Sequence, residues 1–120
     1  MKILIVDDSK LMQKTIAKIL GNKFLNAEIS LASNGEEGFA LFKEIQPDVV
    51  TIDLLMPVMN GIELLKLLSK EQHNSKLFVL SADVQKVVQE EVKALGATFI
   101  AKPFTEEKAV ELVTMIQKSS

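Results

Sequence analysis

The sequence predicts an α/β protein in which five parallel strands form one doubly wound sheet with helices on both faces. Short runs of branched apolar residues alternate with amphipathic segments from one end of the chain to the other. This strict alternation implies parallel strands joined by right-handed crossovers. The 120 residues are too few for a barrel of eight such units, which needs ~250. We therefore expect residues 1–120 to form a single domain.

The first two strand–helix pairs occupy residues 3–45. Residues 3–6 are branched and apolar, as in a strand that is buried on both faces. Helical periodicity follows over residues 10–20, with lysines opposite the apolar side, and we expect Gly21 to end this helix. An alternating strand over 28–32 and a helix over 36–45, which Pro47 ends, form the second pair.

The other three pairs follow the same pattern. A strand over 49–52 and a loop containing Pro57 and Gly61 lead into a helix over 62–68. A strand over 77–80 precedes a helix over 84–95, which we expect Asp83 to cap and Gly96 to end. The last strand is predicted over 98–101 and the last helix over 105–117, with acidic residues in its first turn, where the helix dipole favours them.

Composition and charge exclude several classes of protein. The hydrophobic fraction of 48% and the charged fraction of 25% are those of a globular domain. The net charge is −2, and no dense block of Lys or Arg indicates binding to nucleic acid or to a membrane. Without cysteine, disulfides and thiol catalysis are excluded. No signal peptide or apolar run of ~20 residues is present, so we expect a cytoplasmic protein.

Polar side chains follow four of the predicted strands at the point where each strand ends. Asp7 and Asp8 follow the first strand, Asp53 the third, Ser81 the fourth and Lys102 the fifth. These side chains should lie close together, because the carboxyl ends of parallel strands meet at one edge of a sheet, where ligands bind. Clustered carboxylates repel one another unless a cation joins them, and a few oxygen ligands suit Mg²⁺. An aspartate can also act as a nucleophile, so the sequence predicts a magnesium-assisted phosphoryl site.

The motifs around these residues resemble the receiver domains of two-component signalling. The motifs are VDDS at 6–9, DLLMP at 53–57 followed by Asn60 and Gly61, SA at 81–82 and AKPF at 101–104. They occur in the order and at the spacing of the family, and the resemblance covers essentially the whole chain. It implies the flavodoxin-like fold, with the strand order 2-1-3-4-5.

The resemblance also implies a role for each residue of the site. Asp53 would be the phospho-acceptor. Magnesium would be bound directly by Asp8 and Asp53, through water by Asp7, and by the backbone carbonyl of Leu55. This set of ligands comes from the family and not from spacing.

Further residues match the switch of the family. Ser81 corresponds to a hydroxyl that bonds a phosphoryl oxygen, and Ala82 to a small residue that leaves room for the phosphoryl group. Lys102 would pair with the phosphoryl group, and the bond from Lys102 to Pro103 is expected to be cis. Phe99 matches the switch aromatic. Partners of the family usually dock on the fourth helix, fifth strand and fifth helix.

A stand-alone regulator is the function that these roles imply. It would take a phosphoryl group from a histidine kinase and catalyse this transfer and its own slow dephosphorylation, so that it is primarily a switch rather than an enzyme. The DSKLM segment at 8–12 is similar to chemotaxis-type receivers, which implies a motor or chemotaxis protein as the target. We expect a monomer; dimerisation on activation and an auxiliary phosphatase stay open.

Three alternatives stay open. The domain could be cut from a longer regulator, although the sequence stops at Ser119 and Ser120, directly after the last predicted helix, which favours a natural terminus. A flavin-binding electron carrier would have the same fold, but two carboxylates after the first strand would repel the flavin phosphate. A phosphatase or mutase with an aspartyl nucleophile commonly has a second acid two residues later, where Leu55 lies. We also expect Leu55 to shield the acyl phosphate, and His73 to lie in a solvated loop.

Overall fold

The computed structural model describes residues 1–118 and confirms the parallel sheet, with strand order β2-β1-β3-β4-β5. Ser119 and Ser120, where the expected natural terminus falls, lie outside the described residues. The strands are β1 (Lys2–Val6), β2 (Glu28–Ala32), β3 (Val49–Asp53), β4 (Lys76–Ser81) and β5 (Ala97–Ala101). The helices are α1 (Lys10–Lys23), α2 (Gly35–Ile45), α3 (Gly61–Leu68), α4 (Lys86–Ala94) and α5 (Glu106–Lys118).

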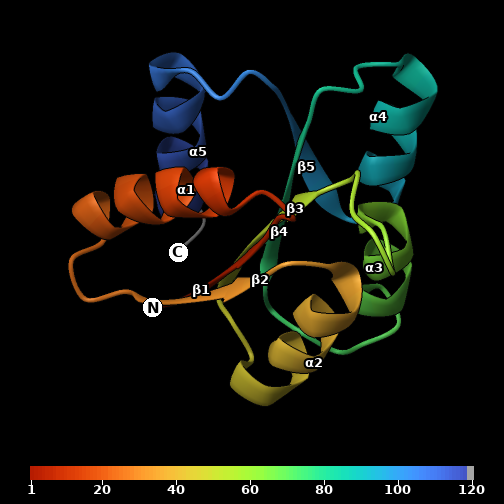
Figure 1. The fold of residues 1–120 in the computed structure, drawn as a ribbon, viewed down its shortest axis with the longest axis horizontal. Helices are drawn as coiled ribbons and strands as arrows, with labels where there is room; N and C mark the ends of the chain where they lie inside the picture. Colours follow the sequence, from red (N-terminus) through yellow and green to blue (C-terminus); the bar gives the residue numbers. More distant parts are fainter. Residues whose placement is uncertain (119–120) are drawn as a thin grey trace.

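Helices cover both faces of the sheet, α1 and α5 on one side and α2, α3 and α4 on the other (Figure 1). Two apolar cores result, because successive side chains of a strand point to opposite faces. In β1, Ile3 and Ile5 face the α1 and α5 side, whereas Leu4 and Val6 face the α2 to α4 side. All four side chains are buried, so the central strands hold the carboxyl edge of the sheet rigidly. No helix in residues 1–118 has the length and apolar character needed to span a membrane.

Helix α1 is longer than the sequence predicts. The predicted end at Gly21 is wrong, because the helix continues to Lys23 and the Phe24 N–H donates to the Leu20 carbonyl at 2.8 Å. The additional residues bring Phe24 against the core beneath α1 and α5. This contact outweighs the roughly 1 kcal/mol by which glycine disfavours a helix interior.

The start of α4 also differs from the prediction. The helix begins at Lys86 rather than at Val84, and Asp83 does not cap its first turn. Instead, the Asp83 carboxylate accepts the Gln85 N–H at 3.1 Å, while the Asp83 N–H donates to the Ser81 hydroxyl at 3.0 Å. These bonds form turns between β4 and α4, so helical geometry begins two residues later. Gly96 follows the helix with a φ of 88°, as predicted for its end.

Candidate functional site

Three carboxylates meet at the carboxyl edge of the sheet. Asp7 and Asp8 follow β1, and Asp53 ends the adjacent strand β3. One oxygen from each lies within 4.8 Å of the others. Asp7 and Asp53 are buried, whereas Asp8 is exposed. The Asp7 carboxylate is also fixed from its own loop, because it accepts the Ser9 N–H at 2.9 Å.

Lys102 adds a positive charge to this cluster from the edge strand β5. Its Nζ lies 3.5 Å from Asp53 Oδ1 and 3.7 Å from Asp7 Oδ2. Lys102 follows β5, so its side chain must reach past the end of β4; its N–H donates to the Ser81 carbonyl there. The bond from Lys102 to Pro103 is cis, as expected.

The charges of the site are not balanced by Lys102 alone. Burial raises the pKa of Asp7 above its usual value, although the Ser9 N–H and the Lys102 ammonium act to lower it. Burial also raises the pKa of Asp53, and the neighbouring Asp7 charge raises it further, against the lowering effect of Lys102. Both carboxylates are therefore ionised less readily than exposed ones, because the effect of burial on their pKa values exceeds the lowering effect of Lys102.

An additional cation of the hard type fits this donor set. The available side-chain donors are carboxylate oxygens, and three of them converge. Mg²⁺ takes oxygen ligands, tolerates few of them from the protein and keeps its own water molecules. The backbone N–H of Leu55 lies near the Asp53 carboxylate and acts to lower its pKa.

Ser81 and Ala82 border the cluster at the end of β4, which is the neighbour of β3. Ser81 is buried, and its oxygen accepts the Asp83 N–H. Its own hydroxyl hydrogen stays available for donation to an oxygen. Ala82 is exposed and small. The structure thus places the predicted hydroxyl, carboxylates and ammonium at one edge of the sheet.

Phe99 lies further from the acidic cluster, in the middle of the edge strand β5 and beside Val79 of β4. Its ring is partly buried against the core beneath α2 to α4. Phe99 also borders a groove of about 360 Å³ between α4 and β5, together with Lys86, Gln89 and Lys93. A change in the Phe99 rotamer would therefore alter the surface of α4 and β5.

The loop between β3 and α3 has a conformation that the sequence did not predict. Val58 has a φ of 69°, and the Met59 N–H donates to the Pro57 carbonyl at 2.7 Å across it. This is a γ-turn with a positive central φ, a rare and strained geometry. No signal in the sequence indicates it, because a β-branched residue seldom adopts this region.

Two glycines hold this loop close to the site. The Gly35 N–H donates to the Met59 carbonyl and the Gly61 N–H to the Leu54 carbonyl, each at 3.0 Å. A Cβ on Gly35 would lie 2.6 Å from the Met59 carbonyl oxygen, and a Cβ on Gly61 would collide with the Asp53 carbonyl oxygen. Both positions therefore require glycine.

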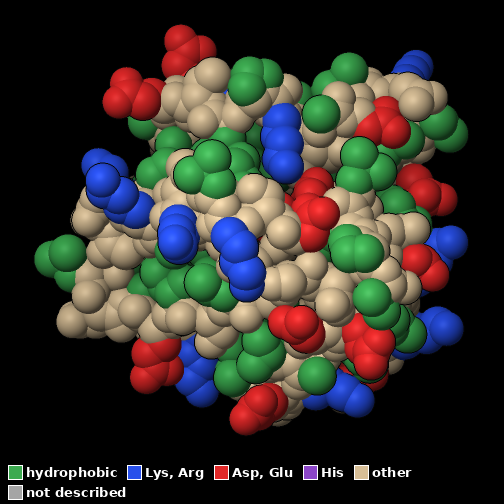
Figure 2. All heavy atoms as spheres, viewed as in Figure 1, with side chains coloured by type: hydrophobic (Ala, Val, Ile, Leu, Met, Phe, Trp, Pro, Cys, Tyr) green, Lys and Arg blue, Asp and Glu red, His purple; other side chains and the backbone are tan. Residues whose placement is uncertain are grey.

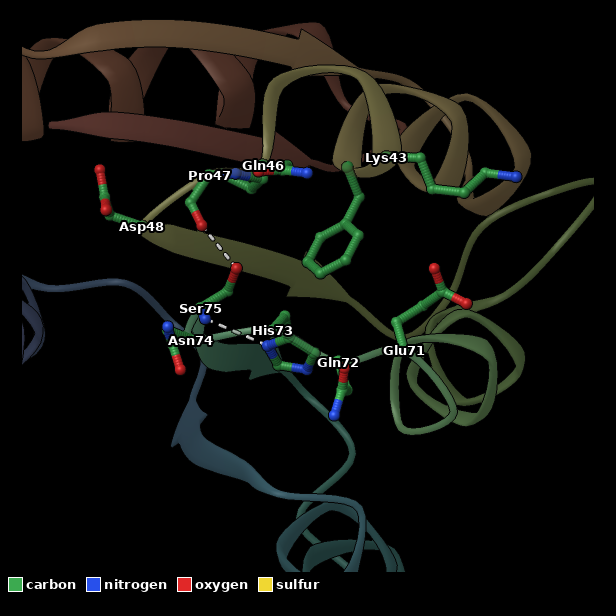
Figure 3. Close-up of a pocket in the computed structure, with 10 residues that line it drawn as sticks. Lys43, Gln46, Pro47, Asp48, Glu71, Gln72, His73, Asn74 and Ser75 are labelled. Atoms are coloured by element: carbon green, nitrogen blue, oxygen red, sulfur yellow. Dashed lines mark hydrogen bonds between the residues drawn. The ribbon is translucent and has the colours of Figure 1, made fainter.

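His73 does not lie in a simply solvated loop, as we had expected. Its ring packs edge-on against Phe42, with centroids 5.2 Å apart, and its Nδ1 accepts the Ser75 N–H at 3.1 Å. Figure 3 shows His73 and Ser75 joined by this hydrogen bond at the border of a polar cavity of about 450 Å³. Pro47 and Ser75 border it, so it lies at the amino ends of β3 and β4, opposite the acidic cluster.

Comparison with known proteins assigns the class of this fold and site. The sequence model of one protein family, the response regulator receiver domain, matches residues 3–114. The chain therefore belongs to the response regulator receiver family. This family assignment gives no support to the two alternative functions, a flavin-binding electron carrier and a phosphatase or mutase.

Individual relatives narrow the assignment to the CheY-like receivers. The chain is 38% identical over 118 residues to the chemotaxis protein CheY of Thermotoga maritima, with 98% of each chain covered. It is 40% identical over 104 residues to a protein-glutamate methylesterase/glutaminase of Bacillus licheniformis, covering 85% of this chain and 29% of that protein. Its fold matches CheY in the CheX–CheY–BeF₃–Mg²⁺ complex of Borrelia burgdorferi with a TM-score of 0.88, at 30% identity and with 97% of this chain and 88% of that one covered.

Proposed function

We propose that this chain is a phospho-accepting response regulator that receives a phosphoryl group on Asp53 from a histidine kinase. The observation that carries the proposal is the Asp53 carboxylate, which lies within reach of two further carboxylates and 3.5 Å from the Lys102 ammonium. Such a group can attack phosphorus while the surrounding charges stabilise the transferred oxygens.

The transfer is a single displacement at phosphorus. A carboxylate oxygen of Asp53 forms the new P–O bond, and the bond from phosphorus to the imidazole nitrogen of the kinase breaks. The released imidazole takes a proton from water. Lys102 pairs with a phosphoryl oxygen, and the hydroxyl of Ser81 donates a hydrogen bond to another.

Asp7, Asp8, Asp53 and the Leu55 carbonyl are the residues that would hold Mg²⁺. When bound, the ion neutralises charge on the phosphoryl oxygens and on the carboxylates whose pKa values burial raises. Attack of water on the acyl phosphate later releases inorganic phosphate and restores the carboxylate. Leu55, two residues after Asp53, has a side chain that is 71% exposed, so it can affect how water approaches the acyl phosphate.

Phosphorylation would act through the α4, β5 and α5 surface. We infer that Ser81 moves toward the phosphoryl group and that Phe99 rotates inward, which changes the groove that Phe99 borders. The similarity to chemotaxis CheY supports a partner protein in the cytoplasmic chemotaxis pathway. The Borrelia complex of CheX with CheY supports an auxiliary protein of that kind. We further propose that residues 1–120 form a single receiver domain that acts as a monomer.

Intact mass after incubation with acetyl phosphate, with and without Mg²⁺, tests the proposal. The parent should gain one phosphoryl group only with Mg²⁺, and Asp53→Asn should gain none. Asp48→Asn is the matched control, because Asp48 is an exposed acid at the opposite end of β3, and it should behave as the parent does. A gain that persists in Asp53→Asn would move the acceptor elsewhere. If no protein is modified even by a histidine kinase, the proposal is wrong.

The lifetime of the acyl phosphate tests the role of Leu55. An exposed apolar side chain beside the bond hinders the approach of water, so Leu55→Asn should hydrolyse several-fold faster than the parent. Release of phosphate from the purified phosphoprotein measures this rate. An unchanged rate would remove the shielding role and leave the acceptor assignment intact.

A further inference from the structure

The outer edge of β2 has backbone groups with no assigned partner. β2 is the terminal strand of the sheet beside β1. The Glu28 N–H donates to the Met1 carbonyl, and the Ala32 carbonyl accepts the Asp7 N–H, so residues 28 and 32 face β1. Because peptide groups alternate along a strand, those of Ile29 and Leu31 point away from β1. No loop, cap or side-chain hydrogen bond recorded within residues 1–118 engages them.

This edge is open and carries apolar residues. Figure 1 shows β2 at the front of the sheet, between α1 and α2. The strand contains no proline, and its only charged residue is Glu28. Leu31 is 42% exposed, and Leu25, in the turn before the strand, is 85% exposed. Open edges of this kind pair readily with another strand.

Lysines of α1 lie along the same edge. The Lys10 ammonium donates to the Ser33 hydroxyl at 3.2 Å, just beyond one end of β2. Near the other end, a Cβ on Gly21 would lie 3.7 Å from Ile29 Cδ1. Helix α1 therefore runs antiparallel to β2, and Lys14 and Lys18, on the helix face between these two contacts, flank the strand. Figure 2 shows lysine side chains in a row on this side of the molecule.

The charge along α1 has no internal counterpart. The helix contains no acidic residue, and the ion pairs found among residues 1–118 are those of Lys102. Like charges four residues apart destabilise a helix. Acidic groups from outside the chain would relieve this repulsion, and they would be placed there by a strand paired with β2.

We propose that the outer edge of β2 binds an extended acidic segment of a partner protein as a sixth strand. The segment bonds to the free peptide groups of Ile29 and Leu31. On the face of the sheet that α1 covers, it directs acidic side chains toward Lys14 and Lys18, and its apolar side chains lie on the opposite face. A second copy of this chain fits less well. Antiparallel pairing about Ser30 would put both α1 helices on one face of the joined sheet, where their lysines repel. The proposal is independent of the chemistry at Asp53.

A capped peptide of alternating glutamate and valine is a suitable probe, and the backbone amide signals of the full chain report its position. At low ionic strength, the Ile29 and Leu31 amides should shift and exchange with solvent more slowly, and added salt should weaken the effect. The matched peptide of alternating lysine and valine should not bind. Shifts of equal size with both peptides, or no shift at Ile29 and Leu31, would overturn the proposal.

Two variants test the two parts of the contact. The double change Lys14→Glu and Lys18→Glu should weaken binding at least about tenfold, because two exposed charge pairs are lost and like charges replace them. The same change at Lys66 and Lys70, which are exposed elsewhere, should have no effect. Leu31→Pro removes an outward N–H and should abolish binding. Protection of Ile29 and Leu31 that grows with protein concentration in the absence of peptide would instead assign the edge to a second copy.

Discussion

Val58 holds a β-branched side chain at a φ of 69° in the loop that follows the acidic cluster. For an L-residue this left-handed conformation costs roughly 1–2 kcal/mol, and β-branching places Val at the upper end. The side chain is 73% exposed, so packing in the folded chain does not offset the strain. Replacing Val58 should therefore stabilise the protein.

The size of the effect follows from two opposing terms. Val58→Gly removes about 2 kcal/mol of strain, but the glycine adds roughly 0.4–1 kcal/mol of conformational entropy to the unfolded chain. A net gain of about 1 kcal/mol is expected. Val58→Asn removes the β-branch but keeps a Cβ at a positive φ, so it should gain less than Val58→Gly does. For 120 residues, an unfolding entropy of ~2.1 cal/mol/K per residue converts the gain of Val58→Gly into a rise in Tm of about 4 °C.

Circular dichroism is the assay of choice, because the chain has no Trp or Tyr. Val110→Gly is the matched control, since Val110 is 63% exposed in helix α5. Glycine should destabilise there by roughly 0.3–0.5 kcal/mol, the difference between Val and Gly in a helix interior, which is opposite in sign to its effect at position 58. If Val58→Gly and Val58→Asn lower Tm as Val110→Gly does, the strain assigned to Val58 is refuted.

Three further predictions concern other positions. Gly21→Ala should raise the free energy of unfolding by up to ~1 kcal/mol in urea, whereas Gly96→Ala, at a φ of 88°, should lower it. Thr51→Val should add about 1 kcal/mol in the same assay, because the buried Thr51 hydroxyl has no hydrogen-bond partner; a large loss would contradict this. Without divalent ions, Asp53→Asn should be more stable than the parent at neutral pH. Because the pKa of Asp53 is raised in the folded chain, protonated Asp53 stabilises the fold fully below pH 3.8, and this stabilisation is lost as the pH rises through the pKa of the folded chain. Unfolding measured over a range of pH should therefore show the difference in stability between Asp53→Asn and the parent vanish in acid.

Much of the site could be predicted from the sequence because of a property of parallel sheets. Buried strands are recognised by their apolar runs, and the residues that follow them must gather at one edge. Asp7 and Asp53 were therefore placed together without any knowledge of side-chain geometry, and the structure brings them within reach of Lys102.

Helix ends were predicted less well, because tertiary contacts decide them. Gly21 is a usual signal for a helix end, but the burial of Phe24 extends α1 beyond it. Asp83 is a usual capping residue, but its hydrogen bonds with Ser81 and Gln85 form turns that delay α4. In both cases the local preference of a residue for a helix end or cap is overridden by a packing contact or hydrogen bond that the sequence does not reveal.

Tertiary contacts also impose the strain at Val58, and these contacts connect the loop to the acidic cluster. A strained residue persists only where surrounding contacts determine its conformation. Here Gly35 of α2 holds Met59, and Gly61 of α3 holds Leu54, at distances that no side chain would permit. These bonds fix both ends of the loop, so Val58 cannot relax without breaking one of them. Because Leu54 directly follows Asp53, the contacts that impose the strain also fix the backbone that carries the candidate acceptor.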